Sequence, residues 1–355
     1  MTNTEKLHSL GQSLWLDNIT RKLLLDGTLE DYIRKLSITG LTSNPTIFEH
    51  AIDSGDVYDK SIRDKAPRGL SGEALFLELA LEDLRQAADL FREVHEATGG
   101  VDGWVSLELS PLLVNDTPAS VKAASQLHAQ ADRPNLFIKI PGTPAGVPAI
   151  EESIFSGVPI NVTLLFSCEQ YLAAAHAYMR GIERRIDAGL DPRVTSVASL
   201  FVSRWDVAVK DEVSLSLHNR LGIAVARQTY KTYRDLLSSD RWQRLADAGA
   251  RPQRLLWAST GTKDPAASDT LYLEALAAPD TINTIPEKTL HAFADHGQVG
   301  ATMPIDGGDA EAVLAAFRRE GIDDRALATR LQIEGAESFS KSWHALLSSV
   351  QRKSS

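Results

Sequence analysis

Short runs of apolar and β-branched residues alternate along the chain with longer segments that have the spacing of amphipathic helices. The apolar runs occupy residues 14–19, 38–43, 104–110, 136–142, 159–166, 193–201, 254–260 and 281–286. The helical patterns include residues 73–98, 120–132, 168–189, 207–237 and 265–276. Strands that alternate with helices form parallel sheets, and eight such strands can close into a barrel. The pattern predicts an α/β fold, a (β/α)8 TIM-type barrel with extra helices.

Two segments exceed what a plain barrel needs. The interval between the second and third runs holds more than one helical pattern, which predicts a helical insertion at about residues 46–102. A C-terminal helix is expected at about residues 324–350, where Phe339 and Trp343 would pack on the barrel exterior or over its mouth. No Pro/Gly/Ser-rich linker or internal repeat divides the chain. We therefore expect one elaborated domain over residues 1–355.

Charge and targeting signals narrow the class of partner. The 37 Lys and Arg residues are outnumbered by 47 Asp and Glu, which gives a net charge of −10 and disfavours nucleic acid or an anionic membrane as partner. The N-terminal residues lack the pattern of a signal peptide, and no apolar run approaches the ~20 residues of a membrane span. A cytoplasmic location is the expectation.

Cofactor motifs are missing from the sequence. Cys168 is the single cysteine, so neither an internal disulfide nor a multi-cysteine metal site is expected. The nine histidines have no recognised metal-ligand spacing, and no GxGxxG motif follows a predicted strand. We therefore predict neither a metal nor a dinucleotide cofactor.

Polar residues share one face of several predicted strands. Side chains alternate between the two faces of a strand, so Ser106, Glu108 and Ser110 face opposite to Val105 and Leu107. The carboxyl ends of barrel strands meet at one mouth, where barrel enzymes build their active sites. The polar residues at or just beyond these ends are Asp17, Asn44, Glu108, Lys139, Asn161, Thr163, Ser199 and Ser259.

Lys139 is the most informative of these residues, because lysine is rarely buried and this one lies between Ile138 and Ile140. Burial disfavours an ammonium and leaves a neutral amine able to attack a ketone carbonyl. The structural alternative is a lysine whose side chain extends from the strand end into solvent. The neighbouring polar strand ends favour the catalytic interpretation.

Asp17 and Glu108 are suited to two proton transfers, one at the hydroxyl whose deprotonation breaks a carbon–carbon bond and one at the water lost during imine formation. Both residues are also ordinary capping residues for loops after strands. Asn44, Asn161 and Thr163 are expected to hydrogen-bond substrate hydroxyls or to position water. Their alternative role is to satisfy neighbouring backbone groups.

Arg204, Ser259 and Lys263 are candidates for binding a phosphate group, since arginine offers a fork and lysine a point charge to an anion. The segment around Gly261 lacks the Gly-Lys-Ser/Thr ending of a P-loop. The alternative is an ordinary loop with solvated charges.

Seven motifs in this order resemble the transaldolase family: WLDNITR, GLTSNPTIF, SLELSP, FIKIPGT, INVTLLFS, ASLFVSRWD and WASTGTKD. The resemblance extends from about Leu7 to Trp343 and implies a barrel of the class I aldolase type with its Schiff-base lysine on the fourth strand. It implies the following roles: Lys139 as nucleophile, Asp17 as acid/base for bond cleavage, Glu108 with Thr163 in water loss, Asn44 and Asn161 as ligands of the dihydroxyacetone unit, and Ser199, Arg204 and Ser259 in the sugar and phosphate site. Many members have an arginine soon after the serine of the seventh strand, where this chain reads STGTK, so Lys263 is the expected replacement.

The activity implied by the resemblance is the transfer of a dihydroxyacetone unit from sedoheptulose 7-phosphate or fructose 6-phosphate to glyceraldehyde 3-phosphate or erythrose 4-phosphate. This is a step of the non-oxidative pentose phosphate pathway that needs no cofactor, and the family also implies a homodimer. One alternative is a fructose-6-phosphate aldolase, although those smaller relatives have glutamine in place of Glu108 and tyrosine in place of Phe201. The other is a barrel that binds sugar phosphates without turning them over.

Overall fold

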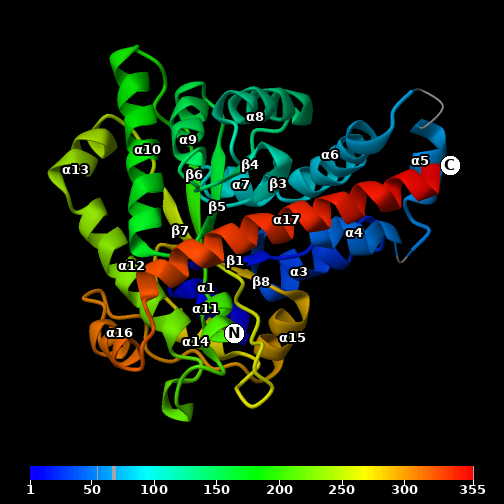
Figure 1. The fold of residues 1–355 in the computed structure, drawn as a ribbon. Helices are drawn as coiled ribbons and strands as arrows, with labels where there is room; N and C mark the ends of the chain where they lie inside the picture. The colour runs from blue at the N-terminus through cyan, green and yellow to red at the C-terminus, as the bar shows by residue number, and fades with distance from the viewer. Residues whose placement is uncertain (54, 66–68, 355) are drawn as a thin grey trace.

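Eight parallel strands close into a barrel in the computed structural model, which describes residues 1–53, 55–65 and 69–354. The strands pair in sequence order, and the first strand also pairs with the last (Figure 1). They are β1 Gln12–Leu16, β2 Ile38–Thr42, β3 Trp104–Glu108, β4 Leu136–Pro141, β5 Ile160–Leu165, β6 Ser196–Phe201, β7 Arg254–Ala258 and β8 Thr281–Ile285. The predicted barrel and all eight predicted strands are confirmed.

The interior of the barrel below Lys139 is filled with aromatic side chains. Phe137 lies two residues before Lys139 on β4, and its ring stacks on Trp104 with centroids 4.1 Å apart and contacts Trp15 at 6.2 Å. Gly40 on β2 permits this packing, because a Cβ there would lie 2.7 Å from both the Trp15 ring and the Trp104 carbonyl oxygen. The aromatic floor therefore closes the barrel beneath the polar strand ends.

Helices surround the barrel (Figure 1). The helices between β2 and β3 and the C-terminal helix are described below. The others are α1 Asn3–Ser9, α2 Arg21–Leu25, α3 Thr28–Leu36, α8 Thr117–Ala131, α9 Gly146–Phe155, α10 Cys168–Asp187, α11 Ser203–Val209, α12 Leu221–Leu237, α13 Asp240–Asp247, α14 Leu271–Ala275, α15 Glu287–His296 and α16 Ala310–Arg319, with 3-10 turns η2 Pro111–Leu113 and η3 Leu215–Leu217. The helical patterns at 120–132 and 168–189 are confirmed as α8 and α10. Helices α9, α15 and α16 were not predicted from the sequence.

The prediction of one helical segment over residues 207–237 is wrong. Asn219 has a left-handed backbone with φ of 59°, which interrupts the helical path. The Asp206 carboxylate then accepts a hydrogen bond of 2.8 Å from the Leu221 amide at the start of α12. Residues 265–276 are likewise mostly a turn, because only Leu271–Ala275 is helical.

Among the described residues between β2 and β3 there are four helices: α4 Pro45–Asp53, α5 Asp59–Lys65, α6 Gly72–Leu90 and α7 Arg92–Ala97. A buried ionic cluster joins α6 and Tyr58 to the segment after β1. Arg21 Nε donates to Asp83 Oδ1 at 2.7 Å, and its Nη2 donates to Glu82 at 3.0 Å. The Tyr58 hydroxyl donates to the other Asp83 oxygen at 2.7 Å. This cluster fixes α6 to the chain that leaves the barrel at Asp17.

We expect Asp83→Asn to destabilise the protein by about 3 kcal/mol or more, because it leaves the buried Arg21 guanidinium without its main countercharge. The Asp83 side chain is fully buried, whereas the side chain of Glu82 is 30% exposed. The measurement is the free energy of unfolding from urea titration, with Glu82→Gln as the control that should cost much less. Equal losses for the two variants would contradict this interpretation of the cluster.

The C-terminal helix α17 Asp324–Ser354 crosses the open end of the barrel, as Figure 1 shows in red. Its farther half packs between α4 and α6: the Trp343 ring meets Phe76 edge-on at 5.1 Å, and the Ser342 hydroxyl accepts a 2.9 Å hydrogen bond from Thr46. The expected C-terminal helix is confirmed, and it lies over the mouth. None of the helices within the described residues is long and apolar enough to cross a membrane.

Candidate active site

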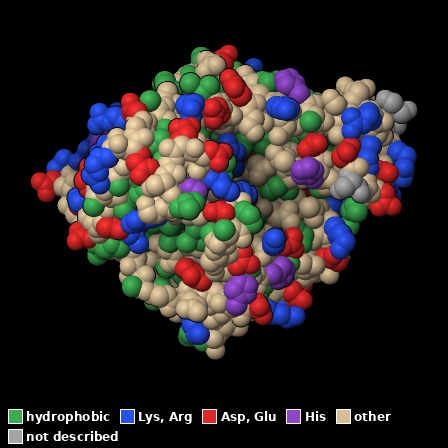
Figure 2. Space-filling view, turned by 60° about the horizontal axis from the view of Figure 1, so that its bottom comes forward, with side chains coloured by type: hydrophobic (Ala, Val, Ile, Leu, Met, Phe, Trp, Pro, Cys, Tyr) green, Lys and Arg blue, Asp and Glu red, His purple; other side chains and the backbone are tan. Residues whose placement is uncertain are grey.

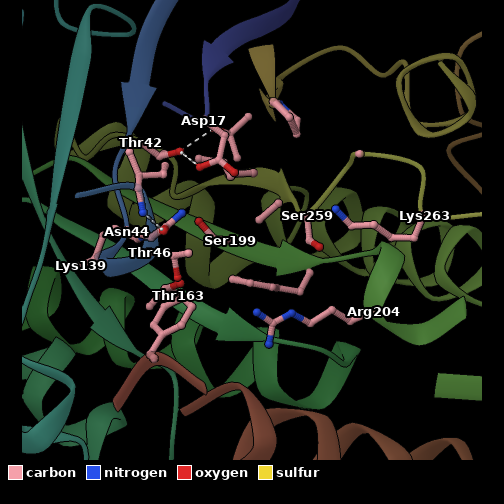
Figure 3. Close-up of a pocket in the computed structure, with 18 of the residues that line it drawn as sticks. Asp17, Thr42, Asn44, Thr46, Lys139, Thr163, Ser199, Arg204, Ser259 and Lys263 are labelled. Carbon is pink, nitrogen blue, oxygen red and sulfur yellow. Dashed lines mark hydrogen bonds between the residues drawn. The ribbon is translucent and has the colours of Figure 1, made fainter. Parts of the chain in front are cut away.

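A cavity of about 270 Å³ opens at the carboxyl ends of the strands. Figure 2 shows the corresponding hollow in the surface, with Lys and Arg side chains at its edge. Eight of the ten predicted site residues line it: Asp17, Asn44, Lys139, Thr163, Ser199, Arg204, Ser259 and Lys263. In Figure 3, Lys139 and Asn44 lie toward one side of the cavity, and Arg204, Ser259 and Lys263 lie toward the other.

Lys139 lines this cavity and forms a buried ion pair with Glu108, which lies behind the cavity lining. The β3–β4 register sets the two residues side by side, and Lys139 Nζ lies 2.6 Å from Glu108 Oε2. The ammonium also donates to the Ser43 carbonyl oxygen at 2.9 Å. Lys139 is only 6% exposed, so it does not extend into solvent as the structural alternative required. Burial raises the pKa of the Glu108 carboxyl, an effect that the Lys139 charge opposes and Asp17 reinforces.

Asp17 follows β1 directly and faces the same cavity. Its backbone amide donates to the Ile285 carbonyl oxygen at 2.8 Å, and its carboxylate accepts a 3.0 Å hydrogen bond from the Thr42 hydroxyl. Burial raises the pKa of Asp17, while the charges of Lys139 and Lys263 and the Thr42 hydrogen bond oppose that rise. A carboxyl group with a raised pKa can exchange protons nearer to neutral pH than an ordinary aspartate.

Two of the predicted hydrogen-bonding residues, Asn44 and Asn161, have hydrogen-bond partners within the protein. The Asn44 side-chain oxygen accepts from the Ile47 amide at 3.1 Å and so caps α4, which leaves the side-chain NH2 group to face the cavity. Asn161 lies below the cavity lining, where its NH2 donates to Ser106 at 3.1 Å and its oxygen accepts from Ser199 at 2.7 Å. Asn161 thus supports Ser199 from beneath, and direct substrate contact by Asn161 stays a prediction.

Thr163 is buried on β5, and its hydroxyl has no hydrogen-bond partner among the described residues. A buried hydroxyl without a partner is costly unless a ligand or water satisfies it. Since Thr163 lines the cavity beside Lys139, its hydroxyl is available to a molecule bound there.

The opposite side of the cavity is cationic. Arg204, at the start of α11, is partly buried with its guanidinium 5.3 Å from the Phe201 ring, and Lys263 lies in the loop after β7. Within the described part of the chain, neither side chain has an ion pair or a hydrogen bond. Burial lowers the pKa of Arg204, but arginine stays protonated in proteins. Two unpaired cations in one cavity indicate a site for an anionic group.

The Ser259 backbone is left-handed with φ of 55°, and its hydroxyl lies 2.9 Å from that of Ser203. This conformation is uncommon outside glycine and is typical of functional loops. It turns the chain after β7 so that Ser259, Gly261 and Lys263 all reach the cavity.

Several residues that line the cavity were not predicted from the sequence. Thr46, Ile47 and His50 come from α4, and Phe339 comes from α17 with its ring centroid 6.0 Å from Lys139 Nζ. The amphipathic pattern of the C-terminal helix indicated an apolar face at Phe339. It did not indicate which surface that face covers, because periodicity identifies a buried face and not its partner.

Comparison with known proteins gives consistent matches over almost the whole chain. The sequence model described as Transaldolase/Fructose-6-phosphate aldolase matches residues 14–350. Among curated proteins, a transaldolase of Parafrankia sp. is 44% identical over 98% of this chain and 96% of its own length. Transaldolases of Thermobifida fusca and Saccharopolyspora erythraea are 45% and 43% identical, over 98% and 99% of this chain and 97% and 98% of their own lengths.

Proposed function

The chain belongs to the transaldolase/fructose-6-phosphate aldolase family and has the transaldolase function of its full-length relatives, and we propose that Lys139 carries this function as a Schiff-base nucleophile. The observation that supports the proposal most directly is the buried Lys139–Glu108 pair, 2.6 Å apart, whose lysine lines a cavity with cations on its far side. Such a site combines a nucleophile, a proton acceptor and an anchor for a charged substrate.

Imine formation begins with proton transfer inside the pair. When Glu108 accepts a proton from the Lys139 ammonium, two buried charges disappear and a neutral amine remains. The amine attacks the C2 ketone of the sugar phosphate, and the carbinolamine then loses water as Glu108 returns its proton to the leaving hydroxyl. The unpartnered Thr163 hydroxyl is available to bind that water.

Bond cleavage then uses Asp17. Its carboxylate accepts the proton of the C4 hydroxyl, the C3–C4 bond breaks, and the bonding electrons move into the iminium to give an enamine on Lys139. An aldose phosphate leaves as the aldehyde. The enamine attacks the aldehyde carbon of a second aldose phosphate, and Asp17 returns the proton to the new hydroxyl. Hydrolysis of the imine frees the product ketose.

Arg204, Ser259 and Lys263 select the substrate by its phosphate. They lie across the cavity from Lys139, so a linear sugar bound to the lysine through C2 would direct its far end toward them (Figure 3). Arginine and lysine form strong charge-assisted hydrogen bonds to phosphate oxygens. Ketose and aldose phosphates are therefore the substrates that this cavity accommodates.

The experiment that tests the proposal is borohydride trapping with fructose 6-phosphate, read by intact mass, alongside an unreduced assay with and without erythrose 4-phosphate. A reduced dihydroxyacetone adduct together with acceptor-dependent sedoheptulose 7-phosphate formation is the expected result. Release of free dihydroxyacetone at the same rate without acceptor would point to an aldolase. Absence of both adduct and turnover would refute the Schiff-base role.

The pH dependence of bond cleavage should reflect the ionisation of the Asp17 carboxyl. The carboxyl must be ionised to accept the C4 proton, and its pKa is raised above the ordinary 3.8, so the single-turnover rate should fall as pH drops through that raised pKa. Since the Lys263 charge opposes the rise, Lys263→Met should move this acid limb to higher pH. Rates of aldose phosphate release between about pH 4 and 8 provide the measurement. If the acid limb of the pH–rate profile stays in place in Lys263→Met, that limb reports the ionisation of a group other than Asp17.

A further inference from the structure

We propose that Gln332, on the C-terminal helix α17, is a positioning residue that joins the ends of β4 and β5 and so holds Thr163 in place beside Lys139. The proposal rests on the function proposed above. Gln332 is 8% exposed, and its side-chain NH2 group donates to two backbone oxygens, that of Gly142 at 3.1 Å and that of Leu164 at 2.9 Å. Each oxygen lies just beyond a residue of the site, Gly142 after the Lys139 strand and Leu164 after Thr163.

The end of β5 is irregular where Gln332 holds it. The pairing of β5 with β6 shifts register between Val162 and Leu165, and Leu164 has a left-handed backbone with φ of 57°. A branched side chain is rarely found in that conformation, so the surrounding structure must fix it. The hydrogen bond from Gln332 to the Leu164 carbonyl is one such constraint.

Gln332 is connected to the Thr163 backbone through two neighbouring residues, Gly142 and Leu164. The Gly142 amide donates to the Thr163 carbonyl oxygen at 2.8 Å, while the Gly142 carbonyl accepts from Gln332. The next residue, Leu164, also accepts from Gln332. The same amide group therefore holds Leu164 directly and the Thr163 carbonyl through Gly142, while the Thr163 hydroxyl itself has no hydrogen-bond partner among the described residues.

Helix α17 lies close enough to β5 for Gln332 to reach the Gly142 and Leu164 carbonyl oxygens. One turn farther along, a Cβ on Gly335 would lie 3.0 Å from Leu164 Cδ2 and 3.3 Å from Arg204 Nη1, so glycine allows α17 to approach β5 closely. Two turns along, Phe339 reaches the cavity. Positions 332, 335 and 339 share one helix face, as the 3.6-residue period requires. This face of α17 contacts the carboxyl ends of β4 and β5 and holds them in position.

The test compares Gln332→Met, which keeps the length of the side chain and removes its donors, with Ile333→Met on the exposed face of the same helix. We expect Gln332→Met to reduce kcat and the rate of borohydride-trapped imine formation by the same factor, roughly 10- to 100-fold, because a displacement of about 1 Å at a reacting site can cost about 100-fold. The KM for fructose 6-phosphate should change less than about threefold, because the phosphate site is untouched. Ile333→Met should retain the wild-type values. An unchanged trapping rate in Gln332→Met would overturn the proposal.

A double-mutant cycle separates positioning from a general structural effect. If Gln332 acts through Thr163, then adding Gln332→Met to Thr163→Val should produce almost no further loss of kcat. Fully multiplicative losses would overturn the proposal.

Gln332→Glu gives a second readout that does not depend on the methionine variant folding. A protonated glutamic acid can still donate one hydrogen bond, whereas its carboxylate repels both carbonyl oxygens. The ratio of Gln332→Glu activity to wild-type activity should therefore rise as pH falls, and a flat ratio would count against the proposal. Failure of the wild-type protein to form any trapped adduct would instead refute the proposed function.

Discussion

Lys139→Met is expected to abolish transfer, with kcat reduced by roughly 10⁴-fold or more, the scale seen when covalent enzymes lose their nucleophile. Methionine approximates the length of lysine and keeps the cavity filled, but it cannot form an imine. The remaining Glu108 would lose the charge that opposes the rise of its pKa, which favours the neutral carboxyl and limits the structural cost. The cationic side of the cavity stays intact, so fructose 6-phosphate should still bind.

The measurements for this variant are intact mass after borohydride reduction and the dissociation constant for fructose 6-phosphate. Lys263→Met is the matched control, because it removes another cavity lysine by the same substitution and should still yield the reduced adduct. An adduct of undiminished yield on Lys139→Met would place the covalent chemistry at a different lysine.

Arg204→Met is expected to have the second largest effect, a loss of about 3 kcal/mol in kcat/KM for fructose 6-phosphate, or roughly 150-fold. The guanidinium makes no ion pair within the described residues, so phosphate would be its first full countercharge. Lys263 is exposed, and water screens its charge more strongly. Lys263→Met should therefore cost less than Arg204→Met.

Unphosphorylated fructose provides the control for both variants. If the two cations serve the phosphate, kcat/KM for fructose should be nearly the same in wild type, Arg204→Met and Lys263→Met. A large loss with fructose in Arg204→Met would show that the arginine supports the fold of the site. A larger loss in Lys263→Met than in Arg204→Met with fructose 6-phosphate would make lysine the principal phosphate ligand.

The barrel and most of its mouth were predictable because both depend on short periodicities. Alternation along β3 and β4 placed Glu108 and Lys139 on inward faces, and the parallel register then set them side by side. The sequence could not give the 2.6 Å distance between them, which depends on the stagger between the two strands. Lys139 was expected beside apolar neighbours, and its buried countercharge became visible only in the structure.

Other features depend on contacts between distant segments, which local patterns do not encode. Gln332 donates to a carbonyl 190 positions earlier in the chain, and its own segment shows only that one face of a helix is buried. The two partners of Asn161 were likewise unpredictable, since Ser106 and Ser199 come from different strands. Helix α9 was missed because its sequence GVPAIEESIF opens with glycine and proline and is too short to establish a clear period.

The position of α17 also has a consequence for biosynthesis. A ribosome releases the N-terminal residues first, so all eight strands emerge before this helix does. A nascent chain can pair its strands while the support for Leu164 and the ring above Lys139 are still missing. Catalytic competence would then arise only after α17 has emerged, and chains terminated before this helix would have a barrel without a finished site.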